Sequence, residues 1–80
     1  HFHSDTVYEG MSFGAKEYDR AFATGSLKGM TFYCPNRKET ERLRSRCIGF
    51  SRSRRHIIET TLIDDNHIII RYTGTLPEPR

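Results

Sequence analysis

The 80-residue sequence predicts a small α+β domain in which one helix packs on a four- to five-stranded antiparallel sheet closed by one disulfide. Three observations support this fold class: an amphipathic segment at 12–25, two β-branched segments around a polar turn at 64–66, and a single pair of cysteines. A chain this short buries only about 60% of the surface that it exposes when unfolded, so we expect a cross-link to contribute strongly to its stability.

A helix is predicted between Ser12 and Gly25. Serine commonly caps helix N-termini, and Gly25 can end the helix in a left-handed conformation. Between them, Ala15, Tyr18 and Phe22 recur at helical spacing, whereas charged residues occupy much of the opposite face. We therefore expect this helix to pack on the sheet through these three side chains.

Two strands are predicted at 56–63 and 67–73, with Asp64-Asp65-Asn66 as the hairpin turn between them. Both segments are rich in β-branched residues. Ile57 and Ile58 point to opposite faces of such a strand. Apolar residues on both faces are typical of a strand that lies inside a sheet or beneath a helix.

The segment between the two cysteines, residues 35–47, permits two structures. Asn36 and Glu39 have the spacing of a capping box, which indicates a helix. A straight helix from Arg37 to Cys47 would be about 15 Å long, whereas bridged cysteines have Cα atoms roughly 5.5 Å apart. A full helix and a disulfide are therefore hard to reconcile.

A disulfide between Cys34 and Cys47 is the favoured alternative, because an even number of cysteines in a small chain favours pairing over two free thiols. The bridge predicts antiparallel strands at Met30–Cys34 and Cys47–Ser51 with a basic loop between them. A strand at about 6–10 would complete the sheet.

Basic residues are concentrated in one segment. Residues 37–55 hold eight of the 13 Lys and Arg but two acidic residues, a net charge of +6, whereas the remainder carries −3. Arginine binds phosphate with two parallel hydrogen bonds, so this asymmetry indicates a surface for RNA or another polyanion; the alternative is a solvated loop that keeps the protein soluble. The candidate nucleic-acid or anion-binding residues are Arg37, Lys38, Arg42, Arg44, Arg46, Arg52, Arg54 and Arg55.

The sequence contains no complete catalytic motif. Cleavage of RNA without a metal needs a general base, a general acid and a cation for the phosphate. An active nuclease would use Glu59, His67 and Arg55 for these roles, but a salt bridge from Glu59 to Arg71 across the hairpin is an equal alternative. We therefore expect no catalytic residues, no cofactor and no metal site.

Four segments carry a resemblance to a known family. Val7-Tyr8-Glu9-Gly10 lies where that family has Tyr-x-Cys, and the predicted helix Ala15–Thr24 matches its helix in position. Arg54-Arg55-His56-Ile57-Ile58 resembles its Asp-Arg-Val-Val strand, and Tyr72-Thr73-Gly74 resembles its His-Thr-Gly. The chain thus resembles the guanyl-specific fungal ribonucleases and, more closely, the ribonuclease-like secreted effectors of cereal mildew fungi.

The resemblance implies a single ribonuclease-like domain over residues 1–80, in which 76–80 form an extended tail. Arg55 would take the place of the phosphate-binding arginine. Tyr72 stands where the family has the histidine that acts as general acid. The segment Met30–Cys34 lacks the glutamate that acts as the family's general base. The family resemblance therefore implies a scaffold without catalysis.

The function that follows is that of a secreted virulence effector of a fungal plant pathogen. It would bind RNA or a host protein, such as a plant immune receptor, inside host cells. The start at His1 is typical either of a processed N-terminus or of a chain cut at this point. The longest apolar run, Ile68-Ile69-Ile70, is too short for a membrane span, so we expect no membrane contact. We also expect a monomer. The alternatives are a small active ribonuclease or ribotoxin and a basic antimicrobial miniprotein.

Overall fold

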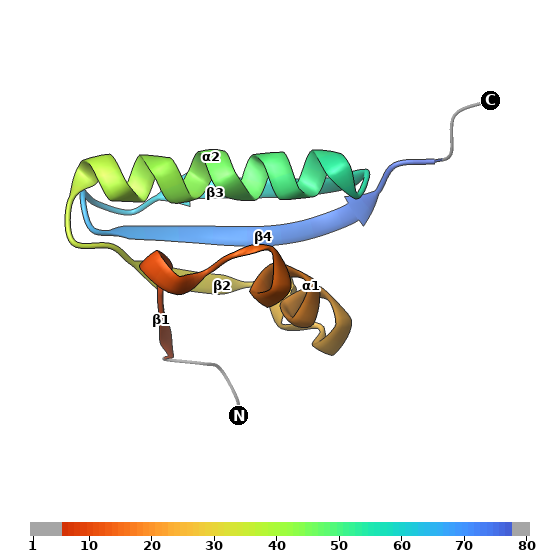
Figure 1. The fold of residues 1–80 in the computed structure, drawn as a ribbon, viewed down its shortest axis with the longest axis horizontal. Helices are drawn as coiled ribbons and strands as arrows, with labels where there is room; N and C mark the ends of the chain where they lie inside the picture. The colour runs from red at the N-terminus through yellow and green to blue at the C-terminus, as the bar shows by residue number, and fades with distance from the viewer. Residues whose placement is uncertain (1–5, 78–80) are drawn as a thin grey trace.

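The computed structural model describes residues 6–77, which form a four-stranded sheet with two helices packed on one face (Figure 1). The elements follow the order β1 (Val7–Glu9), the 3-10 turn η1 (Gly10–Ser12), α1 (Ala15–Thr24), the 3-10 turn η2 (Ser26–Lys28), β2 (Met30–Tyr33), α2 (Arg37–Ser53), β3 (His56–Leu62) and β4 (His67–Thr75). The predicted α+β class is therefore confirmed.

The sheet is mixed rather than antiparallel. Its strand order is β1-β2-β4-β3, with β1 parallel to β2 and the other two pairings antiparallel. β1 runs parallel to β2 because the chain crosses from one to the other through α1, as parallel neighbours require a long connection. The wholly antiparallel sheet expected from the sequence is therefore wrong in this detail.

The β3–β4 hairpin is confirmed. Its register pairs Glu59 with Arg71, and the Ile63 N–H donates to the His67 carbonyl at 2.9 Å. In the turn, the Asn66 N–H donates to Asp64 Oδ1 at 2.8 Å. β4 lies between β2 and β3, which explains why this strand carries isoleucines on both faces.

The first helix begins later than the sequence predicted. Gly14 is its N-cap, and Glu17 accepts a hydrogen bond from the Gly14 N–H at 3.0 Å; Gly25 ends it with a φ of 86°. The predicted end is therefore confirmed, whereas Ser12 belongs to η1. The buried side chains of α1 are Tyr18 and Ala21. The observed packing face is therefore rotated around the helix axis relative to the predicted one.

The segment after β2 is a 17-residue helix, not a strand and a loop. Asn36 Oδ1 accepts a hydrogen bond from the Glu39 N–H at 2.9 Å, which satisfies a donor at the helix start. A stripe of α2 is buried against the sheet, consisting of Thr40, Leu43, Cys47 and Ser51. The strand predicted at Cys47–Ser51 is wrong, because these residues lie in α2 and supply the C-terminal part of that stripe.

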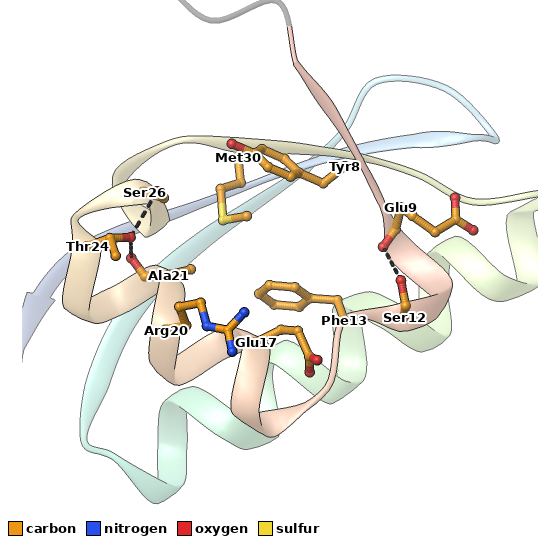
Figure 2. A pocket seen from close by; sticks show the side chains of 10 residues that line it. All are labelled: Tyr8, Glu9, Ser12, Phe13, Glu17, Arg20, Ala21, Thr24, Ser26 and Met30. Carbon is orange, nitrogen blue, oxygen red and sulfur yellow. Dashed lines mark hydrogen bonds between the residues drawn. The ribbon is translucent and has the colours of Figure 1, made fainter.

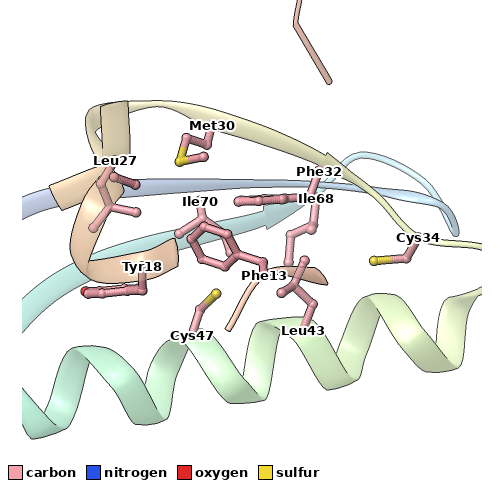
Figure 3. Close-up of a cluster of buried hydrophobic side chains, with 11 residues drawn as sticks. Phe13, Tyr18, Leu27, Met30, Phe32, Cys34, Leu43, Cys47, Ile68 and Ile70 are labelled. Atoms are coloured by element: carbon pink, nitrogen blue, oxygen red, sulfur yellow. The ribbon is translucent and has the colours of Figure 1, made fainter. Parts of the chain in front are cut away.

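The predicted disulfide is also wrong, since Cys34 and Cys47 are both free and fully buried. Cys34 lies beside Leu43 (Figure 3). Leu43 precedes Cys47 by one turn of α2. The conflict between a helix and a disulfide is thus resolved in favour of the helix, and both thiols pack as core side chains.

The core fills the space between the sheet and the helices (Figure 3). Phe13 and Phe32 contact each other at its centre, with ring centroids 4.6 Å apart. Its buried members are Phe13, Tyr18, Ala21, Leu27, Met30, Phe32, Cys34, Leu43, Cys47, Ile68 and Ile70. These apolar contacts hold α2 on the sheet without a covalent link.

Both thiols should be unreactive in the folded protein. Burial raises the pKa of each thiol, that of Cys47 to about 12, so little thiolate exists at neutral pH. Without reductant, the intact mass should equal that of the dithiol, and iodoacetamide should label the cysteines only in denaturant. A mass lower by two hydrogens would show that the disulfide forms.

Substitution of Gly10 by alanine should destabilise the fold by roughly 1–3 kcal/mol. An added Cβ would lie 2.5 Å from Cys34 Sγ and 2.9 Å from Leu43 Cδ2. Urea unfolding measures the loss, with Gly49→Ala in α2 as the control, because a Cβ there has nothing within 4 Å. The control should gain about 0.5–1 kcal/mol of helix stability, and equal effects of the two variants would contradict the contact.

Candidate nucleic-acid interface

The basic residues predicted to bind an anion lie on and just after α2, where helical spacing separates them. Lys38, Arg42 and Arg46 are four residues apart, so they follow one side of the helix at intervals of about 6 Å. This basic stripe, defined as these three residues, borders an open hollow of about 560 Å³ that is also lined by Glu41 and Ser45.

The basic stripe retains most of its hydrogen-bonding capacity. Lys38 has no side-chain partner among the described residues. Arg42 is exposed and contacts the half-buried Glu39 at 3.2 Å through one nitrogen, which leaves its other donors for a ligand. Arg46 donates one hydrogen bond, at 3.1 Å, to the Gly10 carbonyl and keeps its other donors.

Arg37 and Arg44 point instead toward the hairpin. Arg37 pairs with Glu41 at 2.7 Å and with Asp65 in the β3–β4 turn at 3.0 Å. Arg44 Nε donates to Thr60 Oγ1 of β3 at 3.2 Å. These two arginines therefore fix α2 to the hairpin rather than join the basic stripe, and Arg52 lies exposed near the C-terminal end of α2.

Arg54 has a structural role. Its guanidinium donates to both carboxylate oxygens of Asp19, at 2.5 and 3.0 Å, and lies over the rings of Tyr18 and Phe50. The hydrogen bonds from Arg54 lower the pKa of Asp19. The pair connects α1 with the end of α2, a long-range contact that nothing in the local sequence indicates.

Arg55, the predicted phosphate-binding residue, holds the segment after β4. Its φ is 60°, its carbonyl accepts a hydrogen bond from the Leu76 N–H at 2.6 Å, and its guanidinium donates to the Pro77 carbonyl. Its Nε is buried without a partner. The guanidinium is therefore engaged with the chain itself, away from the basic stripe.

The structure does not bring Arg55, Glu59 and His67 together. Arg55 lies in the turn before β3, four residues before Glu59, and His67 lies opposite Ile63, four residues beyond Glu59, so each step is on the order of 13 Å. Glu59 accepts from Arg71 at 2.5 Å, which is the alternative salt bridge, and His67 Nδ1 lies 2.9 Å from Asp64. These positions do not converge on one phosphate.

A separate apolar pocket of about 340 Å³ lies between β1, β2 and α1 (Figure 2). Its floor includes Phe13 and Met30, and Arg20 and Glu17 lie at its rim (Figure 2). The Glu17 carboxylate accepts the N-cap hydrogen bond, and the backbone N–H groups there lower its pKa. Glu17 is therefore held ionised for capping rather than poised to donate a proton.

His56, at the start of β3, contacts α1 and β4. Its Nδ1 lies 2.9 Å from Tyr18 Oη, its ring stacks on Phe22 at 4.4 Å, and Tyr72 contacts it edge-on at 5.1 Å. Burial, with a contribution from Arg54, lowers the pKa of His56. The neutral imidazole is thus a packing and hydrogen-bonding group.

Comparisons with protein-family models, curated proteins and solved structures gave no match. Within residues 6–77, no helix is long and apolar enough to cross a membrane. The same residues contain no group of three His, Cys, Asp or Glu side chains arranged to hold a metal ion. The function must therefore be argued from the geometry of the surface.

The stability of the fold should decrease as the pH falls below about 6.5, the usual pKa of histidine. The pKa of His56 is lower in the folded protein, so in this range the unfolded chain takes up a proton that the folded chain does not. The decrease should end below the folded pKa. Urea unfolding across this range measures it, and the His56→Gln variant should show a shallower decrease; an equal slope in both proteins would contradict the assignment.

Proposed function

We propose that this protein binds RNA through the basic stripe of α2 and does so without catalysis. The observation that supports the proposal most directly is the alignment of Lys38, Arg42 and Arg46 along one side of the helix around an open hollow. Phosphate groups along an RNA backbone are the ligands that such a line of cations suits.

The arrangement costs the free protein stability. Lys38 with Arg42, and Arg42 with Arg46, are like charges at i and i+4, which destabilise a helix by about 0.2–0.5 kcal/mol each. Lys38 also lies in the first turn, where the helix dipole disfavours cations. A bound polyanion removes both penalties, so the stripe is better suited to the bound state than to the free one.

The contacts should be to the backbone rather than to the bases. The residues that line the hollow are all charged or polar, without an aromatic side chain on which a base could stack. Phe32 is fully buried, and Phe50 packs against the core beneath Arg54. Binding of this kind depends on charge and shows little sequence preference.

The biological setting remains the one that the sequence resemblance implies. We propose that the protein is a secreted fungal effector that acts in a plant cell, a proposal that rests on the sequence resemblance alone. The separation of Arg55, in the turn before β3, from Glu59 and His67 in the hairpin supports binding over turnover.

The Lys38→Gln/Arg42→Gln variant should bind RNA roughly 10–100-fold more weakly at low salt. Three phosphate contacts on a single strand predict a slope of log K against log salt of about −2, and loss of two contacts should reduce it to about −0.7. Fluorescence anisotropy with a labelled single-stranded RNA measures both quantities. The RNA should stay intact on a gel, and cleavage would favour the active ribonuclease.

The matched control is Lys16→Gln/Arg20→Gln on α1. This pair is also exposed, also four residues apart on a helix, and removes the same charge. The control should retain most of the affinity and of the salt slope. If both double variants lose affinity equally, net charge alone causes the binding and the assigned surface is wrong.

A further inference from the structure

β3 forms the long free edge of the sheet. It has seven residues, against three for β1 at the opposite edge. The hydrogen bond from the Ile63 N–H to the His67 carbonyl shows which residues of β3 direct their backbone groups toward β4. In an antiparallel pair, alternate residues bond to the neighbour, so the backbone groups of Ile58, Thr60 and Leu62 point away from the sheet.

This edge lacks most of the features that protect edge strands. Natural edges are blocked by proline, lysine, short length or a bulge. The β3 sequence contains neither proline nor lysine, and its one irregularity lies between Ile57 and Ile58. The stretch 58–62 is therefore a regular, unpaired template for another strand.

The two sides of this edge differ in character. On the side of α2, the exposed Arg44 lies above the middle of the strand, because its Nε donates to Thr60 Oγ1. On the opposite face, Ile57 and Ile63 are 45% and 55% exposed. A strand added to the edge would place alternate side chains beside the arginine and, on the opposite face, beside Glu59 and Thr61, with Ile57 and Ile63 at the two ends.

We propose that the outer edge of β3 binds an extended peptide segment of another protein, whose side chains alternate between acidic and apolar. The backbone of Ile58, Thr60 and Leu62 supplies the strand pairing. An acidic side chain opposite Thr60 meets the free donors of Arg44, and apolar side chains at the two ends of the added strand cover Ile57 and Ile63.

The charge near the edge selects a different protein over a second copy of this chain. Two copies paired about an axis through Thr60 would place Arg44 against the same arginine of the other copy. Like charges that face each other across paired strands repel. An acidic strand converts this positive charge into an attraction. The proposal does not depend on RNA binding, since the basic stripe lies on another side of α2.

Amide exchange along β3 tests the pairing directly. The probe is a short peptide of alternating valine and glutamate, added to the full chain labelled with nitrogen-15. At saturation, exchange at Ile58, Thr60 and Leu62 should slow by about tenfold or more, because these amides gain partners. Glu59 and Thr61 already bond to β4 and should change little. Uniform or absent protection would overturn the proposal.

Two variants separate backbone pairing from charge. Thr60→Pro removes an outward N–H that β4 does not use, so it should lower the affinity for the peptide by roughly tenfold. Thr60→Val keeps this N–H and should bind the peptide more tightly than the proline variant does. Arg44→Glu should reverse the preference, so that a peptide of alternating valine and lysine binds more tightly than the glutamate peptide. An unchanged preference would overturn the assigned chemistry even if the proline variant fails to fold.

Two further measurements keep this site distinct from the RNA surface and from self-association. The Lys38→Gln/Arg42→Gln variant should bind the valine–glutamate peptide with unchanged affinity. The protein alone should sediment as a monomer. Dimers whose β3 amides show the same alternating protection would overturn the proposal in favour of a second copy.

Discussion

The close approach of η1 to α2 at Gly10 is the constraint on which the rest of the fold depends. Cys34 and Leu43 occupy the space that a side chain at this position would need. Because nothing projects from Gly10, the end of β1 reaches the helix, and Arg46 donates to its carbonyl. β2 continues directly into the Cys34 contact, so one point joins three elements. A fold this small has few such points, and the loss of one affects the whole core.

The docking of α2 sorts the charged side chains. Leu43 and Cys47 face the sheet. Charged residues that flank this buried side of α2 lie close enough to the sheet to bond with it, as Arg44 does with Thr60. Residues at the opposite angle, such as Lys38, meet solvent. One basic segment thus supplies both the contacts that hold the helix and the cations available to a ligand. The division follows from helical geometry rather than from composition, and it makes net charge a poor guide to which arginine binds an anion.

Local patterns predicted the elements that local interactions determine. The β3–β4 hairpin and the end of α1 at Gly25 follow from β-branched content and glycine chemistry, and the cap at Asn36 was visible as well. A full helix and a Cys34–Cys47 disulfide exclude each other in this segment, and the structure has the helix, with both thiols free and buried in the core. The pairing of Arg54 with Asp19 crosses 35 residues and has no local signature. The basic stripe was recoverable, since Lys38 and its neighbours recur at helical spacing once α2 is accepted.

The layering of the fold determines which surfaces remain for function. Both helices pack on one face of the sheet, so the outward side of α2 and the outer edge of β3 belong to different environments. The helix presents charge on side chains that face solvent, which suits a ligand without fixed sequence. The edge presents fixed backbone groups, which require a partner in extended conformation. Arg44 lies where the two environments meet, held by Thr60 yet with free donors. Its one hydrogen bond therefore positions a cation over the strand, and selectivity at the edge depends on that placement more than on the total charge of the helix.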